Sequence, residues 1–206
     1  MTNVLSIGHS TLTYESFLDL LKCQKVTAIA DVRSSPFSRY FPHFNQSELK
    51  NQLSKDGISY VFLGKELGGR PSSKSLYSHG VADYEKMAKT SDFVKGVERV
   101  ISGSEMYRIA MMCSERHPLD CHRCLLVGRA LKEKGIIVQH IMADGSTIDQ
   151  NEVEDRLLEM SGNKEADMFS TLNDLLSEAY HKRSKRVAFA ESSQKPKSMS
   201  SERDLV

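Results

Sequence analysis

The chain has 206 residues, of which 39% are hydrophobic, and a formal net charge of +1 at pH 7. This length is enough for one hydrophobic core, and the near-neutral charge argues against bulk attraction to nucleic acid or membranes. No apolar run approaches the roughly 20 residues that span a bilayer, and the first residues lack the basic start of a signal peptide. We therefore expect one soluble domain with a cytoplasmic location.

Apolar segments of strand length alternate with amphipathic helical segments from residue 3 to about 142. The predicted strands are 4–8, 26–32, 58–63, 106–112 and 136–142, and the predicted helices are 13–24, a short helix before Gly57, 81–102 and 120–134. This order is typical of βα units, whose right-handed crossovers place helices on both faces of a parallel sheet. The expected fold is an α/β three-layer sandwich with a mostly parallel five-stranded sheet, followed by C-terminal helices and a disordered tail.

The chain divides into three predicted parts. Residues 1–148 form the α/β domain, and residues 149–180 form a helical extension, because apolar residues recur there at helical spacing. Residues 181–206 are rich in Lys, Arg and Ser and lack a hydrophobic face, so we expect a disordered basic tail. The tail is a candidate contact for nucleic acid or an acidic partner, but a solvated tail without function is the favoured interpretation.

The segment 107–124 contains more reactive side chains than any other. It runs from an apolar strand into a polar loop and then a helix, and it holds three of the four cysteines. Asp120 is predicted to cap the helix, which places Cys121, His122 and Arg123 in the first turn. Free backbone N–H groups and the helix dipole attract anions there and lower the pKa of a thiol.

The cysteines support three alternative readings. Cys121 is a candidate nucleophile or activated thiol; Cys113, Cys121 and Cys124 with a histidine are candidate zinc ligands; and Cys121 with Cys124 has the spacing of a redox pair. Cys113 alone is best explained as a small buried hydrophobe at a strand end. Zinc is disfavoured because the sequence offers no second close pair of ligands, so the prediction includes no metal and no cofactor.

Polar residues follow each of the first four predicted strands. Because the carboxyl ends of parallel strands meet at one edge of a sheet, these residues are expected to converge on one site. Structural roles compete with this reading: helix capping for the first pair, an ion pair for the second, and solvated surface charge for Arg39, Arg70 and Arg116. In chain order the residues are His9 and Ser10; Asp31 and Arg33; Gly68, Gly69 and Arg70; and Cys113, Glu115, Cys121, His122 and Arg123.

Four motifs in this order resemble a known family. They are Ile7-Gly8-His9-Ser10, then Asp31-Val32-Arg33 with Pro36 and Ser38, then Leu67-Gly68-Gly69, then Cys113-x-Glu115 followed by Pro118 and Cys121-His122-Arg123. Over roughly residues 3–145 the chain is similar to the bacterial and archaeal domain of unknown function 488. The resemblance implies a Rossmann-like α/β fold and a site at these motifs, but no reaction. Cys124 departs from the family's usual pattern, which weighs against zinc and redox readings that need it.

The leading hypothesis is a pocket for a phosphate-bearing or otherwise anionic small ligand, such as a nucleotide or a nucleic-acid component. Arg33 and Arg123 would bind charge, Cys121 would be the nucleophile or a polarised thiol, and Glu115 or His9 would transfer protons. The full set expected at the pocket is His9, Ser10, Arg33, Glu115, Cys121, His122 and Arg123.

The alternative hypothesis is a non-catalytic binding or interaction module. In that case Asp31, Arg33, Glu115 and Arg123 form a structural ion network that ties the loops together. One observation separates the two hypotheses. An open pocket that reaches Cys121 and Arg123 supports a ligand site, whereas a filled, salt-bridged cleft supports the module.

Overall fold

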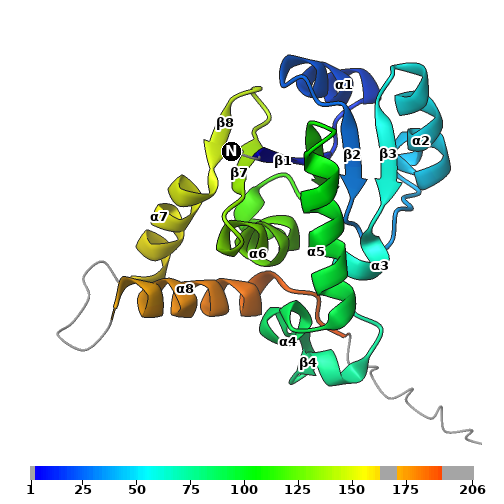
Figure 1. The fold of residues 1–206 in the computed structure, drawn as a ribbon. Helices are drawn as coiled ribbons and strands as arrows, with labels where there is room; N and C mark the ends of the chain where they lie inside the picture. The colour runs from blue at the N-terminus through cyan, green and yellow to red at the C-terminus, as the bar shows by residue number, and fades with distance from the viewer. Residues whose placement is uncertain (1–2, 163–170, 192–206) are drawn as a thin grey trace, which may run out of the picture.

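A computed structural model describes residues 3–162 and 171–191 of the chain. Its centre is a six-stranded sheet with the strand order β3-β2-β6-β1-β7-β8 (Figure 1). The strands are β1 (Asn3–Gly8), β2 (Ala28–Asp31), β3 (Ser59–Phe62), β6 (Ile109–Cys113), β7 (Ile137–Ile141) and β8 (Thr147–Asp149). The first five of these run parallel to their neighbours, as predicted, and β8 is antiparallel to β7.

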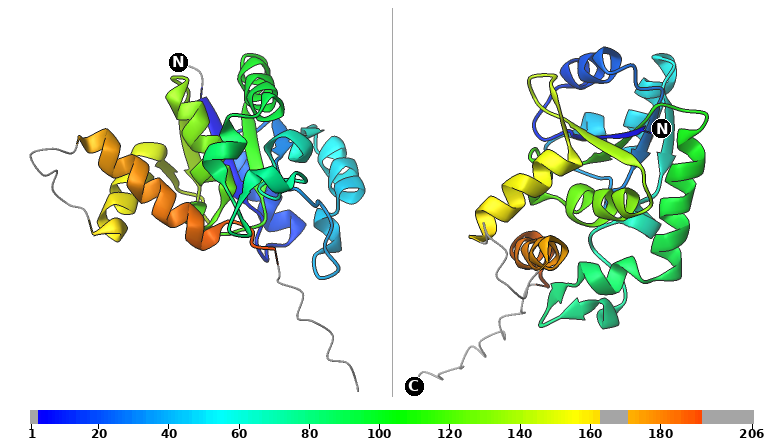
Figure 2. Two further views of the ribbon diagram at one scale, coloured as in Figure 1. Left: turned by 90° about the horizontal axis from the view of Figure 1, so that it is seen from below. Right: turned by 60° about the vertical axis from the view of Figure 1, so that its left-hand side comes forward.

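Helices cover both faces of the sheet (Figure 2). One face packs on α1 (Tyr14–Cys23) and α2 (Gln46–Lys55), and the other on α5 (Ser91–Ser104), α6 (Arg129–Glu133), α7 (Gln150–Ser161) and α8 (Leu172–Val187). Side chains alternate between the two cores along each strand: in β1, Val4 enters one core and Leu5 and Ile7 enter the other. The three-layer α/β sandwich predicted from the sequence is confirmed.

The position of β6 beside β1 sets the location of the site. All five residues of β6 are buried, because it lies between β1 and β2 with helices on both sides. Ile7 of β1 is in register with Met112, and Gly8 with Cys113. The loops that follow β1 and β6 therefore leave the sheet together. Backbone hydrogen bonds from His9 N–H to the Cys113 carbonyl (2.9 Å) and from Ser10 N–H to the Ser114 carbonyl (2.9 Å) hold the two loops side by side.

The region that follows β3 contains more structure than the single helix predicted over 81–102. It forms α3 (Gly64–Leu67), a hairpin of β4 (Tyr77–Ser78) and β5 (Val81–Ala82), α4 (Tyr84–Ala88) and α5. Thr90 caps α5 by accepting a hydrogen bond from the Phe93 N–H. The hairpin was missed because strands of two residues are too short to show an alternating pattern.

The C-terminal part also differs from the prediction. β8 crosses the predicted domain boundary at 148/149, since it adds a strand to the same sheet. The basic tail was expected to begin at His181, but α8 continues to Val187, and Ala190 then forms a β-bridge with Val81. The rest of the predicted tail, 192–206, lies outside the described residues. Across the described ranges, no helix combines the length and apolar character needed to cross a membrane.

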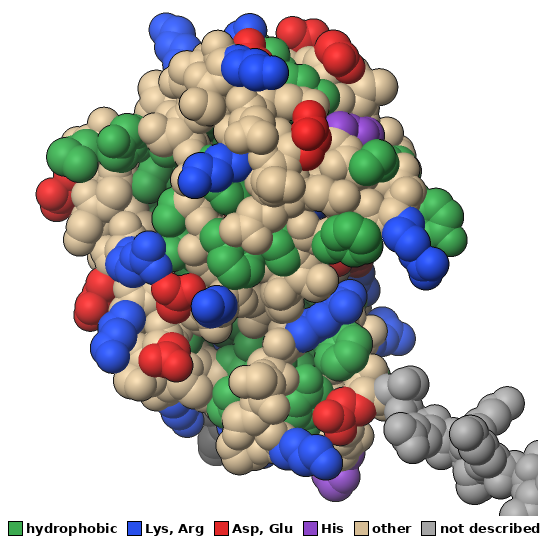
Figure 3. Space-filling view, turned by 90° about the vertical axis from the view of Figure 1, so that its right-hand side faces the viewer, with side chains coloured by type: hydrophobic (Ala, Val, Ile, Leu, Met, Phe, Trp, Pro, Cys, Tyr) green, Lys and Arg blue, Asp and Glu red, His purple; other side chains and the backbone are tan. Residues whose placement is uncertain are grey.

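The edge strand β3 is partly exposed, with Ser59 and Val61 toward solvent. Figure 3 looks onto this side of the molecule and shows hydrophobic side chains scattered among basic and acidic ones. Scattered apolar side chains of this kind are normal on a protein surface. The exposed apolar side chains of this edge therefore need no functional explanation.

Candidate functional site

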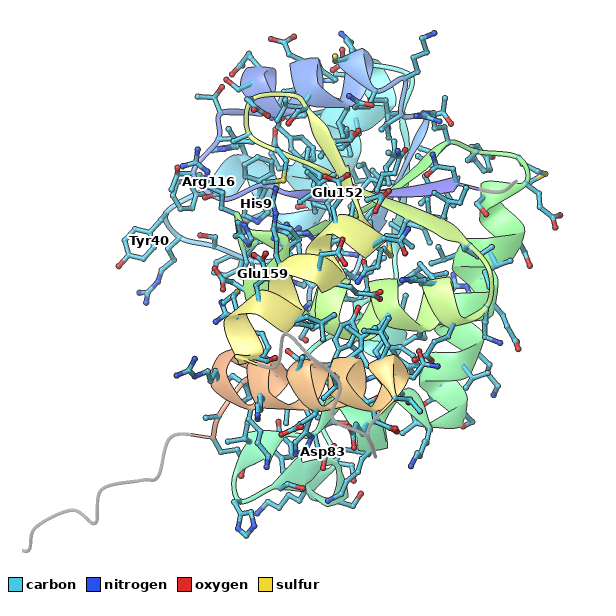
Figure 4. All side chains as sticks on the ribbon, turned by 90° about the vertical axis from the view of Figure 1, so that its left-hand side faces the viewer. His9, Tyr40, Asp83, Arg116, Glu152 and Glu159 are labelled. Carbon is cyan, nitrogen blue, oxygen red and sulfur yellow. The ribbon has the colours of Figure 1, made fainter. Side chains whose placement is uncertain are left out.

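A cleft of about 670 Å³ opens where β1, β2 and β6 end, within the size range of small-molecule sites. Five of the seven residues expected at a pocket line it, together with Cys113. Cys121 and Arg123 do not line the cleft; they are buried behind it, with side chains that are 1% and 0% exposed. Figure 4 shows His9 and Arg116 on the same side of the molecule, with Tyr40 projecting beyond them. The five lining residues are His9, Ser10, Arg33, Glu115 and His122.

Four side chains converge at the inner end of this cleft, and we call them the thiol cluster: Cys113, Glu115, Cys121 and His122. One potential ligand atom from each lies within 4.8 Å of all the others. The Sγ atoms of Cys113 and Cys121 donate to the same Glu115 Oε2, at 2.9 and 3.0 Å. The same two sulfurs lie 3.7 and 3.8 Å from His122 Nδ1.

The backbone around Cys121 explains how the cluster forms. Asp120 does not cap the helix as predicted; it ends a 3₁₀ turn (Pro118–Asp120), and its carboxylate pairs with Arg183 of α8. Cys121 is extended instead, and its Sγ accepts a hydrogen bond from the Arg123 N–H at 3.4 Å. A π-helical turn (Arg123–Gly128) then leads into α6. π-turns inside helices occur frequently at functional sites.

Hydrogen bonding fixes the tautomer of His122. Its Nε2 lies 2.8 Å from the Val32 carbonyl, which can only accept, so Nε2 carries the proton. Burial lowers the pKa of the ring, but the neighbouring Cys121 raises it above its usual value overall. In the neutral ring, Nδ1 presents a lone pair to the two sulfurs. Metal-binding histidines commonly show this arrangement, in which the second ring nitrogen donates to a carbonyl or carboxylate and orients the ring.

The cluster concentrates acidic groups in a buried place. Burial and the hydrogen bond to Cys121 raise the pKa of the Cys113 thiol well above its usual value. Burial alone would also raise the pKa of Cys121, but the hydrogen bond from Cys113 and the charges of Arg123 and His122 lower it. Burial and the nearby Cys121 raise the pKa of Glu115. Three acidic groups thus compete for protons around one point.

The two predicted anion-binding arginines are occupied by protein groups. Arg33 makes a bidentate pair with Asp31 (2.9 and 2.6 Å) and also donates to the Phe44 carbonyl and His9 Nε2. Arg123 donates to the backbone carbonyls of residues 115 and 116, at 2.6 and 3.1 Å. Its Nε has no partner among the described residues. These contacts resemble the structural network of the alternative hypothesis and give no direct support to ligand binding by either arginine.

His9 is a neutral, fully engaged side chain. Its Nδ1 lies 3.1 Å from the Ser10 carbonyl, Arg33 donates to its Nε2 at 3.2 Å, and its ring stacks on Phe44 at 4.2 Å. Burial and the neighbouring Arg33 lower its pKa to about 4. A role for His9 in proton transfer would require it to release Arg33, so Glu115 is the better placed of the two predicted acid/base residues.

Cys124 does not belong to the cluster. Its Sγ contacts the Gln150 side chain, with Nε2 at 3.6 Å, and burial raises the pKa of its thiol to about 12. The group of potential metal ligands within 4.8 Å of one another therefore does not include Cys124, unlike the zinc set considered from the sequence. Sequence reasoning missed that Cys113-x-Glu115 is itself the second close pair of ligands. The signal was available, because one pair ends a strand and the other begins the next helix.

A larger cavity, of about 790 Å³, lies between α4, α6 and α8. Its inner wall is formed largely by apolar side chains such as Leu125, Leu126 and Ala130, and charged side chains surround its rim. None of the thiol cluster residues line it. Size alone therefore does not identify the functional site here, and the smaller cleft is the one that holds reactive groups.

Comparison with protein families matches residues 13–130 to the family described as Domain of unknown function DUF488. The matched range includes the thiol cluster, the Asp31–Arg33 pair and the Gly68-Gly69 motif. Searches of curated proteins and of solved structures returned no match. Because the match covers more than half of the 206 residues, the chain belongs to the DUF488 family.

Proposed function

We propose that the thiol cluster binds a zinc ion, or a similar divalent cation that prefers sulfur and nitrogen, and that this ion activates water for a reaction in the cleft. The observation that carries the proposal is the convergence of two thiols, one imidazole lone pair and one carboxylate within 4.8 Å. Cysteine sulfur and histidine nitrogen, with a carboxylate, are the typical zinc donors in proteins. This proposal replaces the expectation of a metal-free site.

The distances support zinc in particular. Tetrahedral bonds of about 2.3 Å to sulfur and about 2.0 Å to nitrogen place these two atoms roughly 3.6 Å apart. The separations from His122 Nδ1 to the two sulfurs are 3.7 and 3.8 Å. Glu115 Oε2 lies closer to the sulfurs, at hydrogen-bond distance. Zinc would displace the two thiol protons and push this carboxylate outward, toward the cleft.

The charges also balance. With zinc bound, Cys113, Cys121 and Glu115 together carry three negative charges, and Arg123 lies beside the sulfurs with one positive charge. A divalent cation supplies the remaining two. Burying such a set of anions without a cation is costly, because desolvation is not repaid by pairing.

Glu115 is placed to transfer protons at this site. Cys113, Cys121 and His122 are buried, whereas Glu115 is the exposed member of the cluster and faces the cleft. Three protein ligands plus an open fourth position is the pattern of catalytic zinc, where bound water has a pKa near 7. Cys113, Cys121 and His122 would hold the ion, which would supply an activated water, and Glu115 would be placed at the cleft to accept a proton.

Metal content is the direct test of the proposal. The wild-type protein, purified after growth with added zinc, is expected to contain about one zinc per chain by elemental analysis. Cys113→Ser, Cys121→Ser and His122→Ala should lose it, while Cys124→Ser and Cys23→Ser serve as matched controls and should retain it. Wild-type protein without zinc, or equal zinc in all five variants, would refute the proposal.

The open coordination position needs a separate measurement. Cobalt substituted for zinc reports its ligands through its visible spectrum, and thiolate ligands add a charge-transfer band in the near ultraviolet. Azide should perturb the visible bands if a position is open to the cleft. Glu115→Gln is expected to keep the metal and the charge-transfer band, whereas loss of the metal in this variant would make Glu115 a fixed ligand and the zinc structural.

A further inference from the structure

The segment after α8 forms one wall of the cleft. Phe189 accepts a backbone hydrogen bond from Ala82 N–H (2.9 Å), and Glu191 N–H donates to the Gly80 carbonyl (2.8 Å). These bonds hold residues 188–191 against β5, and we call this segment the C-terminal strap. Val187 and Phe189 line the same cleft as Glu115 and His122. The strap therefore places the ring of Phe189 at the cleft.

Arg70 lies over this ring. Its guanidinium carbon is 4.8 Å from the centre of the Phe189 ring, and its backbone N–H donates to Ser34 Oγ at 2.9 Å. The guanidinium groups of Arg33 and Arg123 donate to protein acceptors. The guanidinium of Arg70, in contrast, has no hydrogen bond or ion pair within residues 3–162 and 171–191. Arg70 lines the cleft and is exposed. From the sequence, solvated surface charge was the favoured reading of Arg70 over a ligand contact.

The paired glycines before Arg70 explain its place. A Cβ on Gly69 would lie 2.8 Å from Cγ of His122, and a Cβ on Gly68 would lie 2.3 Å from the Gly64 carbonyl oxygen. Only glycine allows the loop to approach this closely. Arg70 therefore follows directly on a stretch of backbone that packs against His122 of the thiol cluster, and it lines the same cleft as Glu115.

Aromatic rings from the loop after β2 also line the cleft. Phe37 and Phe41 line it, and Phe37 is 67% exposed. Because Phe37 lines the cleft and its ring is exposed, a flat apolar group that enters the cleft can stack on it. The hydroxyls of Ser10, Ser34 and Ser35 lie at the same cleft and supply hydrogen-bonding groups.

We infer that the substrate is a nucleoside monophosphate or a close analogue, with its phosphate on Arg70 and its planar base against Phe37. An arginine fixed over an aromatic ring is well suited to bidentate recognition of phosphate. Bases stack readily on aromatic side chains. Glu115 lines the same cleft and would face the bound ligand. The inference rests on the proposed zinc site for its chemistry, but not for binding.

Binding is tested with the four common nucleoside monophosphates, using inorganic phosphate and ribose 5-phosphate as fragments, by calorimetry on zinc-loaded full-length protein. At least one monophosphate should bind. Arg70→Ala should weaken it about 10- to 100-fold, the loss expected for charge-assisted hydrogen bonds. Arg70→Lys should recover only part of this, because lysine lacks the planar fork. Lys50→Ala, an exposed charge on α2, is the matched control and should bind normally.

Phe37→Ala separates base recognition from phosphate recognition. It should weaken the monophosphate and leave ribose 5-phosphate unchanged. The inference is overturned if no monophosphate binds, if Arg70→Ala binds as well as wild type, or if Phe37→Ala weakens all anions equally. Zinc content of the protein as purified and monophosphate binding are measured separately, which tells the two proposals apart. Monophosphate binding by protein that never holds zinc refutes the metal site alone, and zinc content without monophosphate binding refutes this inference alone. Binding should persist after zinc is removed with a chelator.

Discussion

Two buried polar groups lie on either side of the π-turn, and they differ in how their hydrogen bonds are satisfied. One is the thiol cluster, and the other, which we call the Tyr180 network, consists of Ser6, His140, Gln150, Tyr180 and Glu154. In the Tyr180 network the members form an unbroken chain of hydrogen bonds. The distances along it are 2.6, 2.8, 2.7 and 2.9 Å.

This chain has one consistent direction. The Gln150 oxygen accepts from His140 Nε2, the Gln150 amide donates to Tyr180, and the Tyr180 hydroxyl donates to Glu154, which also pairs with Lys132. Every donor finds an acceptor, so the network is complete without a ligand. The thiol cluster instead aims several acceptors at one point that opens to the cleft. Complete pairing indicates a structural role, and convergent acceptors indicate a binding site.

The comparison is tested most strongly at Arg123, the buried cation beside the thiol cluster. Arg123→Ala should lower the free energy of unfolding by about 3–5 kcal/mol, because it leaves two backbone carbonyls and the Cys121 sulfur uncompensated. Urea unfolding measures the change. Arg116→Ala, an exposed arginine of the same loop, should change stability by less than about 0.5 kcal/mol. Equal effects of the two substitutions would show that Arg123 does not stabilise the fold beside the thiol cluster.

Low pH should reduce the free energy of unfolding through His140, a member of the Tyr180 network. Burial and Arg123 lower its pKa to about 4, from 6.5 in the unfolded chain. The unfolded state therefore binds a proton first, and stability is lost as the pH falls from about 6.5 to 4, by about 3 kcal/mol for this residue. Urea unfolding in the presence of a chelator, from pH 7 to 4, should show a shallower loss in His140→Gln than in wild type. Parallel curves would contradict the assignment.

Tyr180→Phe should lower stability by about 1–3 kcal/mol, because it strands the Gln150 amide and removes a donor from Glu154. Zinc content should stay unchanged if the Tyr180 network is purely structural. Tyr40→Phe is the matched control, since Tyr40 is 85% exposed, and it should leave the unfolding midpoint in place. A loss of zinc in Tyr180→Phe would show that the Tyr180 network and the thiol cluster are coupled.

The smallest effect is expected at Arg183, which ties α8 to the turn before Cys121. Its side chain contacts Asp120 and donates to the Leu119 carbonyl at 3.0 Å. Because the pair is partly exposed, Arg183→Ala should cost no more than about 1 kcal/mol. Zinc release to a chelator should nevertheless be faster than in Lys182→Ala, whose partner Glu178 lies within the same helix. Identical release rates would show that α8 does not steady the cluster.

The sequence was sufficient to predict the sheet and its layers. Apolar runs such as β6 and the repeating helical patterns between strands report burial on both faces, and this property is encoded locally. Gly57 and Gly135 end their helices with φ angles of 75° and 79°, as the sequence placed them. The hairpin of β4 and β5, the added strand β8 and the length of α8 were not predictable in this way. Their stability comes from partners distant in sequence, such as Ala190 beside Val81.

The sequence was enough to predict where the candidate site lies, but only the tertiary structure showed which of its side chains pair with one another. Strand-end residues had to meet because parallel strands share one edge, so Glu115, His122 and Cys113 reach one cleft. The local sequence does not show which arginine side chain lacks a protein acceptor. Arg33 pairs with Asp31 and Arg123 donates to backbone carbonyls, whereas the guanidinium of Arg70 lies above the Phe189 ring. Pairing of side chains depends on distances between loops, and only the folded chain sets those distances.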